Sequence, residues 1–374
     1  MPRKKKSKFF RKITLKSPST KPDWFLVALV FGLAFFGIIM VGNASVVEAY
    51  RDFGDKFYYL RLQAQWLGLG LVAFFLASIF NYRRLKMIAF PLVFFTFASL
   101  VLVLLPGIGF EALGARRWLG IGRFSFQPAE LAKLTFVLYL ASFLSNKKRT
   151  LPFLLLLGLL VVLVMLEPDL GTTVIIVATS LVVYFASGAP LLLLAGLGLL
   201  GLLSGASLIL FSPYRRERLL TFLNPTRDPL GASYHIRQIL IAIGSGGLLG
   251  LGLGQSRQKY EYLPAVTTDS IFAVIAEEIG FVGASVVILA FLLLIWRGFK
   301  IAKEAPDEFG KLLAVGITTW IGFQALINLG AMVALVPLTG VPLPFISYGG
   351  SSLVLALTGV GILLNISKQK VVRK

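Results

Sequence analysis

The stretch from Leu263 to Gly280, LPAVTTDSIFAVIAEEIG, concentrates carboxylates that could do proton chemistry. It places Asp269, Glu277 and Glu278 within ten positions, although the 374 residues of the chain include only 17 acids. Acids next to an apolar run are costly unless they are paired, hydrated or used. A carboxylate near apolar walls has a raised pKa, which suits a general base. We predict that Asp269 is such a base at the mouth of a hydrated cavity.

A structural role for Asp269 stays open beside the catalytic one. Thr267, Thr268 and Asp269 are helix-capping residue types, and they precede the apolar run IFAVIA. On an ideal helix Glu277 would lie about 80° around from Asp269, and Glu278 about 180°. The sequence therefore gives Thr268 and Glu277 as supporting candidates.

A second segment, PLTGVPLPFISYGGSS (337–352), has too many prolines and glycines for a continuous helix. Backbone of this kind survives at membrane depth only against protein or in a wet cavity, so we expect it to line one. Ser347, Ser351 and Ser352 precede a further apolar run and could cap its helix. Such a helix end suits an anion, so Ser347 and Ser351 are candidate anion-binding residues, which the family resemblance given below assigns to a substrate pyrophosphate.

Other charged residues have two interpretations each. Glu130 and Lys133 are three positions apart and form either an ion pair near a helix start or a functional pair that lines a cavity. Asp169, in EPDLGT, is expected mainly to cap the next helix. Five arginines form either a solvated basic rim or a clamp for an anionic headgroup, which we favour: Arg116, Arg117, Arg215, Arg216 and Arg218.

The elements that must position these residues are membrane spans. Hydrophobic residues make up 57% of the chain and charged residues 14%, which is outside the range of soluble domains. Windows of low charge predict an all-α polytopic membrane protein with ten transmembrane helices. Lys and Arg are concentrated in the two tails and in the short loops expected on the same side of the membrane, so both termini are predicted to be cytoplasmic. The predicted spans are 24–44, 64–81, 87–106, 129–145, 151–167, 170–186, 189–211, 271–296, 312–336 and 349–367.

The predicted organisation is one membrane domain, 24–367, between basic cytoplasmic tails at 1–23 and 368–374. Residues 212–270 form a long extracellular loop, in which two segments with helical spacing of apolar residues are expected to lie in the lipid interface. The string GLGLLG (196–201) matches a dinucleotide fingerprint, but it lies inside a span. There we expect its glycines to let helices approach closely.

Composition also excludes several functions. The net charge of +20 sits where topology and anionic lipids place it, and no basic-aromatic module occurs, so no nucleic acid partner is expected. Without cysteine, and with His235 as the single histidine, a thiolate or histidine-rich metal site is impossible. A divalent cation, Mg or Mn, would need oxygen ligands.

Six ordered strings carry a resemblance over nearly the whole chain except the tails. They are FQPAELAKL, EPDLGTT, YRRERLLTFLNPTRD, QILIAIGSGGLLGLGLGQSRQKYEYLP, TDSIFAVIAEEIGFVG and PLTGVPLPFISYGGSS. Together they resemble the SEDS family (shape, elongation, division and sporulation), whose members include FtsW and RodA. The string GQSRQKYEYLP is more similar to FtsW and its sporulation relative SpoVE than to RodA.

The resemblance implies a peptidoglycan glycosyltransferase that polymerises lipid II at the outer face of the bacterial cytoplasmic membrane, in division or cell shape. The essential acid of the family falls on Asp269, which would deprotonate the acceptor hydroxyl in an inverting reaction. The family's ion pair falls on Glu130 and Lys133, and the acid of its EPDLG motif on Asp169. Arginines or a divalent ion would stabilise the leaving pyrophosphate.

The resemblance also implies partners: a class B penicillin-binding protein and other membrane proteins of division or elongation. The sequence departs from the common pattern LPE-x-HTDF, because Ala265, Thr267 and Ser270 replace its glutamate, histidine and phenylalanine. A histidine in that motif is therefore not assigned. A lipid II flippase and a division scaffold without chemistry are the alternative functions, although no second broken segment suggests a transporter repeat.

Overall fold

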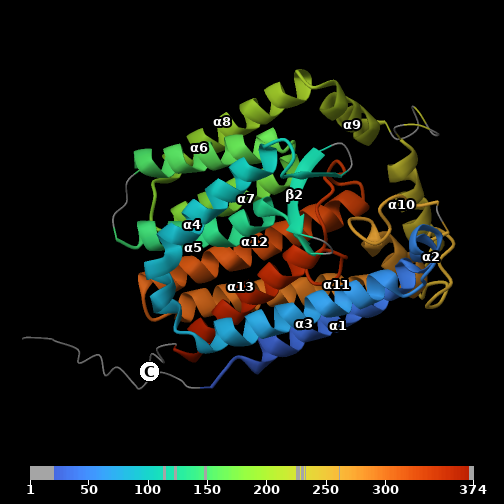
Figure 1. The fold of residues 1–374 in the computed structure, drawn as a ribbon, viewed down its shortest axis with the longest axis horizontal. Helices are drawn as coiled ribbons and strands as arrows, with labels where there is room; N and C mark the ends of the chain where they lie inside the picture. Colours follow the sequence, from blue (N-terminus) through green and yellow to red (C-terminus); the bar gives the residue numbers. More distant parts are fainter. Residues whose placement is uncertain are drawn as a thin grey trace, which may run out of the picture.

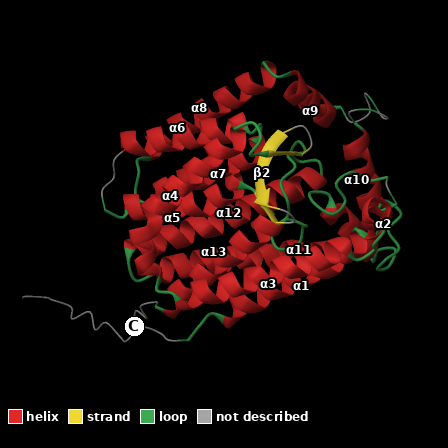
Figure 2. Ribbon diagram, in the orientation of Figure 1, coloured by secondary structure: helices red, strands yellow, loops and turns green. Residues whose placement is uncertain are grey.

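The computed structural model describes residues 21–369, apart from 113–114, 122–123, 147–149, 225–227, 229–230, 232 and 261. The predicted basic tails, except residues 21–23 and 368–369, lie outside the described residues. Within the described part the chain is nearly all helical, an elongated bundle with one small sheet (Figure 1, Figure 2).

Ten helices coincide with the ten predicted spans. They are α1 (Trp24–Ala44), α3 (Tyr58–Ile79), α4 (Tyr82–Leu104), α5 (Pro128–Leu144), α6 (Thr150–Leu166), α7 (Leu170–Ala186), α8 (Leu191–Leu210), α11 (Ile271–Glu304), α12 (Glu308–Met332) and α13 (Gly350–Lys368). In the described part of the chain, seven of them are long and apolar enough to cross a membrane, the others being α5, α6 and α7. Most of α12 and α13 is buried, whereas the surrounding helices expose large apolar side chains. The chain is therefore a polytopic membrane protein.

Three shorter helices lie in the right-hand half of the bundle as drawn in Figure 1. They are α2 (Val46–Phe53), α9 (Pro213–Leu223) and α10 (Tyr234–Ser245). In Figure 1, α1 begins and α13 ends at the left, whereas α2 and α10 lie at the right. The helices α9 and α10 coincide with the two helical segments that the sequence predicts inside the loop 212–270.

The expectation of an all-α fold is wrong between α4 and α5. This connection forms an antiparallel sheet of β1 (Phe110–Ala112), β2 (Ala115–Ile121) and β3 (Phe124–Phe126), in that order. Its glycines and aromatic residues favour short strands and tight turns over a helix. Cross-strand pairing then satisfies backbone groups that a plain loop would leave to solvent.

The predicted single span 271–296 is two helical pieces within α11, because Gly280 has φ 67° and ψ −171°. The loop after α10 inserts at this break and bonds both sides of it. Leu251 N donates to the Glu277 carbonyl and Gly252 N to the Glu278 carbonyl, both at 3.0 Å, and Phe281 N donates to the Gly247 carbonyl at 2.9 Å. The freed backbone groups are therefore satisfied, as a break inside a bundle requires.

Among the described residues, the expected close packing of the GLGLLG glycines does not occur. The structure buries none of the residues of α8. Side-chain carbons added at Gly196, Gly198, Gly201 or Gly205 would meet no described atom within 4 Å. The helix α8 lies at the periphery of the bundle, next to α9 (Figure 1).

We expect Gly280→Ala to lower the free energy of unfolding by at least about 2 kcal/mol, because φ is positive and a Cβ would collide with the Gly250 and Leu248 backbone. The measurement is thermal unfolding in detergent. Gly158→Ala in α6, where a Cβ meets nothing within 4 Å, is the matched control and should leave Tm unchanged or slightly raised. Equal melting of the two variants would contradict the strain argument.

Candidate functional site

Asp269 lies on the turn that leads into α11. The helix begins at Ile271, and Ser270 is its N-cap residue without a side-chain capping bond. The Asp269 carboxylate, which is half-buried, accepts a hydrogen bond from Thr268 Oγ1 at 3.0 Å. Because the residue at the N-cap is Ser270, the capping interpretation of Asp269 is wrong.

The Asp269 side chain lines a cavity of about 300 Å³ between α9, α10 and the segment after α12. That volume is at the lower end of the range for ligand sites, enough for part of a large substrate. The cavity brings Asp269 together with one predicted arginine and with the broken segment, as the sequence suggests. Its lining residues are Glu217, Arg218, Thr221, Phe222, His235, Ile236, Asp269, Leu338 and Gly340.

The broken segment, which is non-helical from 333 to 349, holds the Asp269 turn from behind. Asn328 Nδ2 on α12 donates to the carbonyls of Asp269 and Val341, both at 2.8 Å. Ser347 Oγ donates to the Thr268 carbonyl at 2.5 Å, and Tyr348 N donates to the Thr267 carbonyl at 2.8 Å. The backbone on both sides of the Asp269 carboxylate is thereby fixed.

The serines of the broken segment have structural partners. Ser347 Oγ also accepts from Leu343 N at 2.8 Å, and Ser351 Oγ accepts from Gln127 N at 3.4 Å. The N-cap of α13 is Gly349, with no side-chain capping bond. The expected serine cap is wrong, because these hydroxyls bond loop backbone instead. Neither Ser347 nor Ser351 is among the residues that line the cavity.

Glu130 and Lys133 form the predicted ion pair, with Lys133 Nζ 2.6 Å from Glu130 Oε1 and both side chains buried. Lys133 Nζ also donates to Gln324 Oε1 on α12 at 2.7 Å. Gln324 Nε2 in turn donates to the carbonyl of Pro342 at 3.0 Å. The ion pair therefore connects α5 to the same broken segment that Asn328 holds one helical turn further on.

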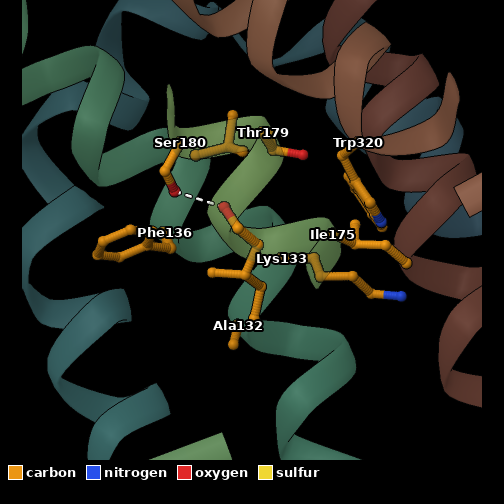
Figure 3. Close-up of a pocket in the computed structure, with 9 residues that line it drawn as sticks. Ala132, Lys133, Phe136, Ile175, Thr179, Ser180 and Trp320 are labelled. Carbon is orange, nitrogen blue, oxygen red and sulfur yellow. Dashed lines mark hydrogen bonds between the residues drawn. The ribbon is translucent and has the colours of Figure 1, made fainter. Parts of the chain in front are cut away.

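A cavity of about 10 Å³ lies beside Lys133 in the core between α5, α7 and α12. Figure 3 shows Lys133, Ile175, Thr179, Ser180 and Trp320 around it. The Trp320 ring lies 5.7 Å from Lys133 Nζ, within cation–π distance. The space has about the volume of one water molecule, so it does not accommodate a sugar.

The two glutamates of the opening stretch hold a loop and do not line the cavity. Glu277 accepts from Ser256 Oγ at 2.5 Å and from Arg257 N at 3.1 Å. Glu278 accepts from Ser256 N at 3.2 Å, from Asn43 Nδ2, and from Lys259 Nζ at 3.4 Å. Glu277 thus supports the chain that leads to Asp269, at a distance from the cavity lining.

Asp169 caps α7, as predicted: it accepts from Thr172 N at 2.9 Å. The turn before it is tied to β2, because Arg117 Nε donates to the Glu167 carbonyl at 2.7 Å and Arg117 also donates to the Pro168 carbonyl at 2.8 Å. The Glu167 carboxylate is buried, and among the described residues neither of its oxygens has a hydrogen-bond partner. The spacing of EPDLGT did not predict an unpartnered acid at this turn.

Of the five predicted arginines, Arg218 lines the cavity, and its guanidinium donates to the Leu338 carbonyl at 3.1 Å. Arg117 fixes the turn after α6, and Arg116 is exposed on β2. Arg215 and Arg216 lie on α9 but not in the cavity lining. Among the described residues no three His, Asp or Glu side chains lie close enough to hold a metal ion.

The residue that sequence reasoning missed at this site is His235, in the first turn of α10. Its Nε2 lies 2.8 Å from Ser270 Oγ, and its ring lines the cavity with Asp269. The two residues are 34 positions apart, so spacing gave no signal. That His235 is the single histidine of a membrane protein was the available clue.

A family model described as cell cycle protein, FtsW/RodA/SpoVE, matches residues 23–371. The chain belongs to this family. It is 43% identical over 362 residues to stage V sporulation protein E of Bacillus subtilis, covering 95% of this chain and 99% of that protein. It is 38% identical over 353 residues to a probable peptidoglycan glycosyltransferase FtsW of a Geobacter species, covering 92% and 96%.

Solved structures of family members have the same fold. A chain from a peptidoglycan synthase complex, described as coordinating polymerization and crosslinking, matches with a TM-score of 0.77 and 36% identity over 92% of this chain and 97% of that one. The rod shape determining protein RodA of Thermus thermophilus matches with a TM-score of 0.69 and 33% identity over 93% and 97%. The SEDS resemblance of the six strings is thereby confirmed.

We expect Lys133→Met to lower the free energy of unfolding by about 3–5 kcal/mol, because Glu130 would be left as a buried charge without its counter-ion. The double variant Glu130→Gln, Lys133→Met removes both charges and should recover much of the loss. Thermal melts in detergent compare the three proteins. A double variant no more stable than the single one would contradict the assignment of the loss to the unpaired carboxylate.

Burial raises the pKa of Glu167 to about 8, with the Asp169 charge adding to the rise and Arg117 opposing it. Between an unfolded value of 4.5 and about 8, the folded chain holds a proton that the unfolded chain releases. Stability should therefore fall as pH rises through this window. We expect Glu167→Gln to melt like the parent at pH 5 and at a higher temperature at pH 8.5.

Glu308→Gln, which removes an exposed carboxylate on α12, is the control for Glu167→Gln. The difference in Tm between Glu308→Gln and the parent should be the same at pH 5 and pH 8.5. A Glu167→Gln difference that is the same at both pH values would contradict the raised pKa.

Proposed function

We propose that this chain is a peptidoglycan glycosyltransferase that polymerises lipid II, with Asp269 as its general base. One observation carries the proposal: the Asp269 carboxylate lines a cavity of about 300 Å³ while its own backbone carbonyl is held at 2.8 Å by Asn328. The names of the relatives, as probable peptidoglycan glycosyltransferases, support the reaction class. The fixed backbone supports a catalytic group, because proton transfer requires a carboxylate of stable orientation.

In the proposed mechanism Asp269 accepts the proton of the 4-hydroxyl of the acceptor N-acetylglucosamine. The resulting oxygen attacks the anomeric carbon of the lipid-linked donor, the bond to the pyrophosphate breaks, and the configuration at that carbon inverts. Undecaprenyl pyrophosphate leaves with the bonding electrons. The cavity volume suits one sugar near Asp269, with the rest of each substrate outside.

The leaving pyrophosphate gains negative charge as the bond breaks, so a cation near it lowers the barrier. Arg218, which lines the cavity with Asp269, is placed to supply this charge. Neither the other predicted arginines nor Ser347 and Ser351 line this cavity. Any contact that they make would be with the lipid-linked part of the substrate, outside the cavity. The described residues provide only Asp269 and Glu217 as acidic oxygen donors in the cavity. A divalent cation, Mg or Mn, would therefore take most of its oxygen ligands from the substrate pyrophosphate and from water.

The proposed topology has ten spans in the bacterial cytoplasmic membrane, both termini in the cytoplasm and the Asp269 cavity at the outer face. Two observations support it. The start of α1 and the end of α13 lie at one end of the bundle, away from α2 and α10 (Figure 1). The segments expected to be inside carry most of the short-loop Lys and Arg. The loop 212–270 would then rest on the outer surface of the membrane.

We also propose that the chain works with a class B penicillin-binding protein, in division or in cell-shape maintenance. The matched synthase complex, which is described as coordinating polymerization and crosslinking, supports such a partner. A transpeptidase at the outer face would crosslink the strands that this chain extends.

We expect Asp269→Asn to reduce lipid II polymerisation by about 100-fold or more, because it removes the base without changing the shape of the side chain. The measurement is the initial rate of glycan formation from labelled lipid II by the purified complex. Tm of the variant should stay close to that of the parent, since among the described residues the Asp269 carboxylate accepts one hydrogen bond, from the Thr268 hydroxyl.

The control is Asp52→Asn, an exposed acid on α2 that pairs with Arg51, which should retain the parental rate. Full polymerisation by Asp269→Asn would refute the proposed base. Translocation of lipid II by the parent, with no polymer formed, would support a flippase instead.

A further inference from the structure

The side chain of His235 interacts with residues on both sides of Asp269. Its Nε2 lies 2.8 Å from the hydroxyl oxygen of Ser270, the residue after the acid. The ring also faces the backbone of Pro264, five positions before the acid, and this interaction favours the protonated imidazole. Proline has no amide hydrogen, so towards Pro264 the ring can act only as a donor to the carbonyl. A neutral imidazole has one donor and one acceptor nitrogen, so Nε2 is then free to accept from the Ser270 hydroxyl.

The charged groups that face His235 come from two other elements. Asp269 belongs to the turn before α11, and Arg218 and Glu217 belong to α9. The broken segment contributes Leu338 and Gly340, which carry no charge. Burial lowers the pKa of His235 below its usual value, the Asp269 charge opposes this, and Arg218 reinforces it. The imidazole is therefore neutral at neutral pH.

No other described imidazole can take this place, because the sequence has a single histidine. Thr267, two residues before Asp269, is buried, and its side chain lies 3.5 Å from Glu48 on α2. Its carbonyl accepts from Tyr348 N. The proton-active partner of Asp269 thus comes from α10 and not from the turn itself.

We propose that His235 is a positioning residue for the reaction: in its neutral form it holds Pro264 and Ser270 and so fixes the orientation of the Asp269 carboxylate, and when protonated it weakens that base. The inference rests on the proposed role of Asp269. Protonation of the imidazole reverses the bond to Ser270, because Nε2 then donates instead of accepting. It also places a positive charge beside Asp269, which stabilises the ionised carboxylate and makes it a poorer proton acceptor.

Proton uptake by His235 therefore contributes to the acid limb of the rate profile. Glutamine at position 235 can donate and accept hydrogen bonds but does not titrate in this range. Alanine leaves the Pro264 carbonyl and the Ser270 hydroxyl without this partner. These two substitutions separate the hydrogen bonds from the charge.

The first experiment is the pH dependence of lipid II polymerisation by the purified complex. We expect His235→Gln to stay within about threefold of the parent at pH 7.5, with its acid limb moved down by about half a pH unit or more. His235→Ala should lose about tenfold or more in kcat, because the carboxylate is no longer oriented. Arg237→Gln, on the same helix but outside the cavity lining, is the control and should keep the parental profile.

The second experiment does not depend on activity. In the chain labelled on histidine and purified without a histidine tag, the imidazole signals belong to one residue, so NMR gives the pKa of His235 directly. We expect that pKa to lie below 6.5 in the parent and to fall further in Asp269→Asn, which lacks the opposing negative charge.

The outcomes are distinguishable. If Asp269→Asn polymerises lipid II at the parental rate, the proposed function fails, whatever His235 does. If Asp269→Asn is inactive but His235→Gln keeps the parental acid limb, or the His235 pKa is the same in Asp269→Asn as in the parent, the inference about His235 is overturned alone. A His235→Ala protein that fails to fold leaves the glutamine profile and the NMR titration to decide.

Discussion

The requirement that buried backbone be hydrogen-bonded governs the half of this molecule that contains the Asp269 cavity. Two stretches inside the bundle are not helical, one at Gly280 in α11 and one between residues 333 and 349. Lipid offers no partners for such backbone, so each break must be bonded by the chain itself. At the first, the loop after α10 supplies amides and carbonyls. At the second, the side chains of Gln324 and Asn328 bond consecutive carbonyls of Pro342 and Val341.

These bonds place Asp269 through a continuous polar chain. Gln324 and Asn328 lie one turn apart on α12, so they present their amides on the same face. The Gln324 side chain accepts a hydrogen bond from the ammonium group of Lys133, and the Asn328 side chain donates one to the carbonyl of Asp269. The buried ion pair near the start of α5 and the carboxylate at the cavity are therefore attached to the same short segment. A substitution at Glu130 can alter the position of Asp269 through this segment, although the two residues are not in contact.

The sequence predicted the helices of this fold better than the contacts of its site. Long apolar runs located ten helices, because length and low charge can be read without knowing a segment's neighbours; seven of the ten, within the described part of the chain, are long and apolar enough to cross a membrane. Helical spacing also located α9 and α10. The sheet at 110–126 was missed because its strands are too short to show a period.

Asp169 as a cap followed from its residue type at a turn before a helix, and the pair of Glu130 with Lys133 followed from a spacing of three residues, which fixes proximity on a helix. The partners of Asp269 did not, because they arise where separate segments meet. The side chains of Ser347 and Glu277 are of types that could bind a substrate, but in the structure they bond the backbone of loops. His235 approaches from α10, and only the folded loop brings it to the acid.

The peripheral position of α8 has a practical consequence for following this protein at work. A helix with no buried residue and open space at its glycines tolerates an attached probe. The chain has no cysteine, so one introduced thiol would be unique in it. A spectroscopic label on α8, next to α9 and its Arg218, would therefore report the binding and release of substrate at the cavity without disturbing the hydrogen bonds that hold Asp269.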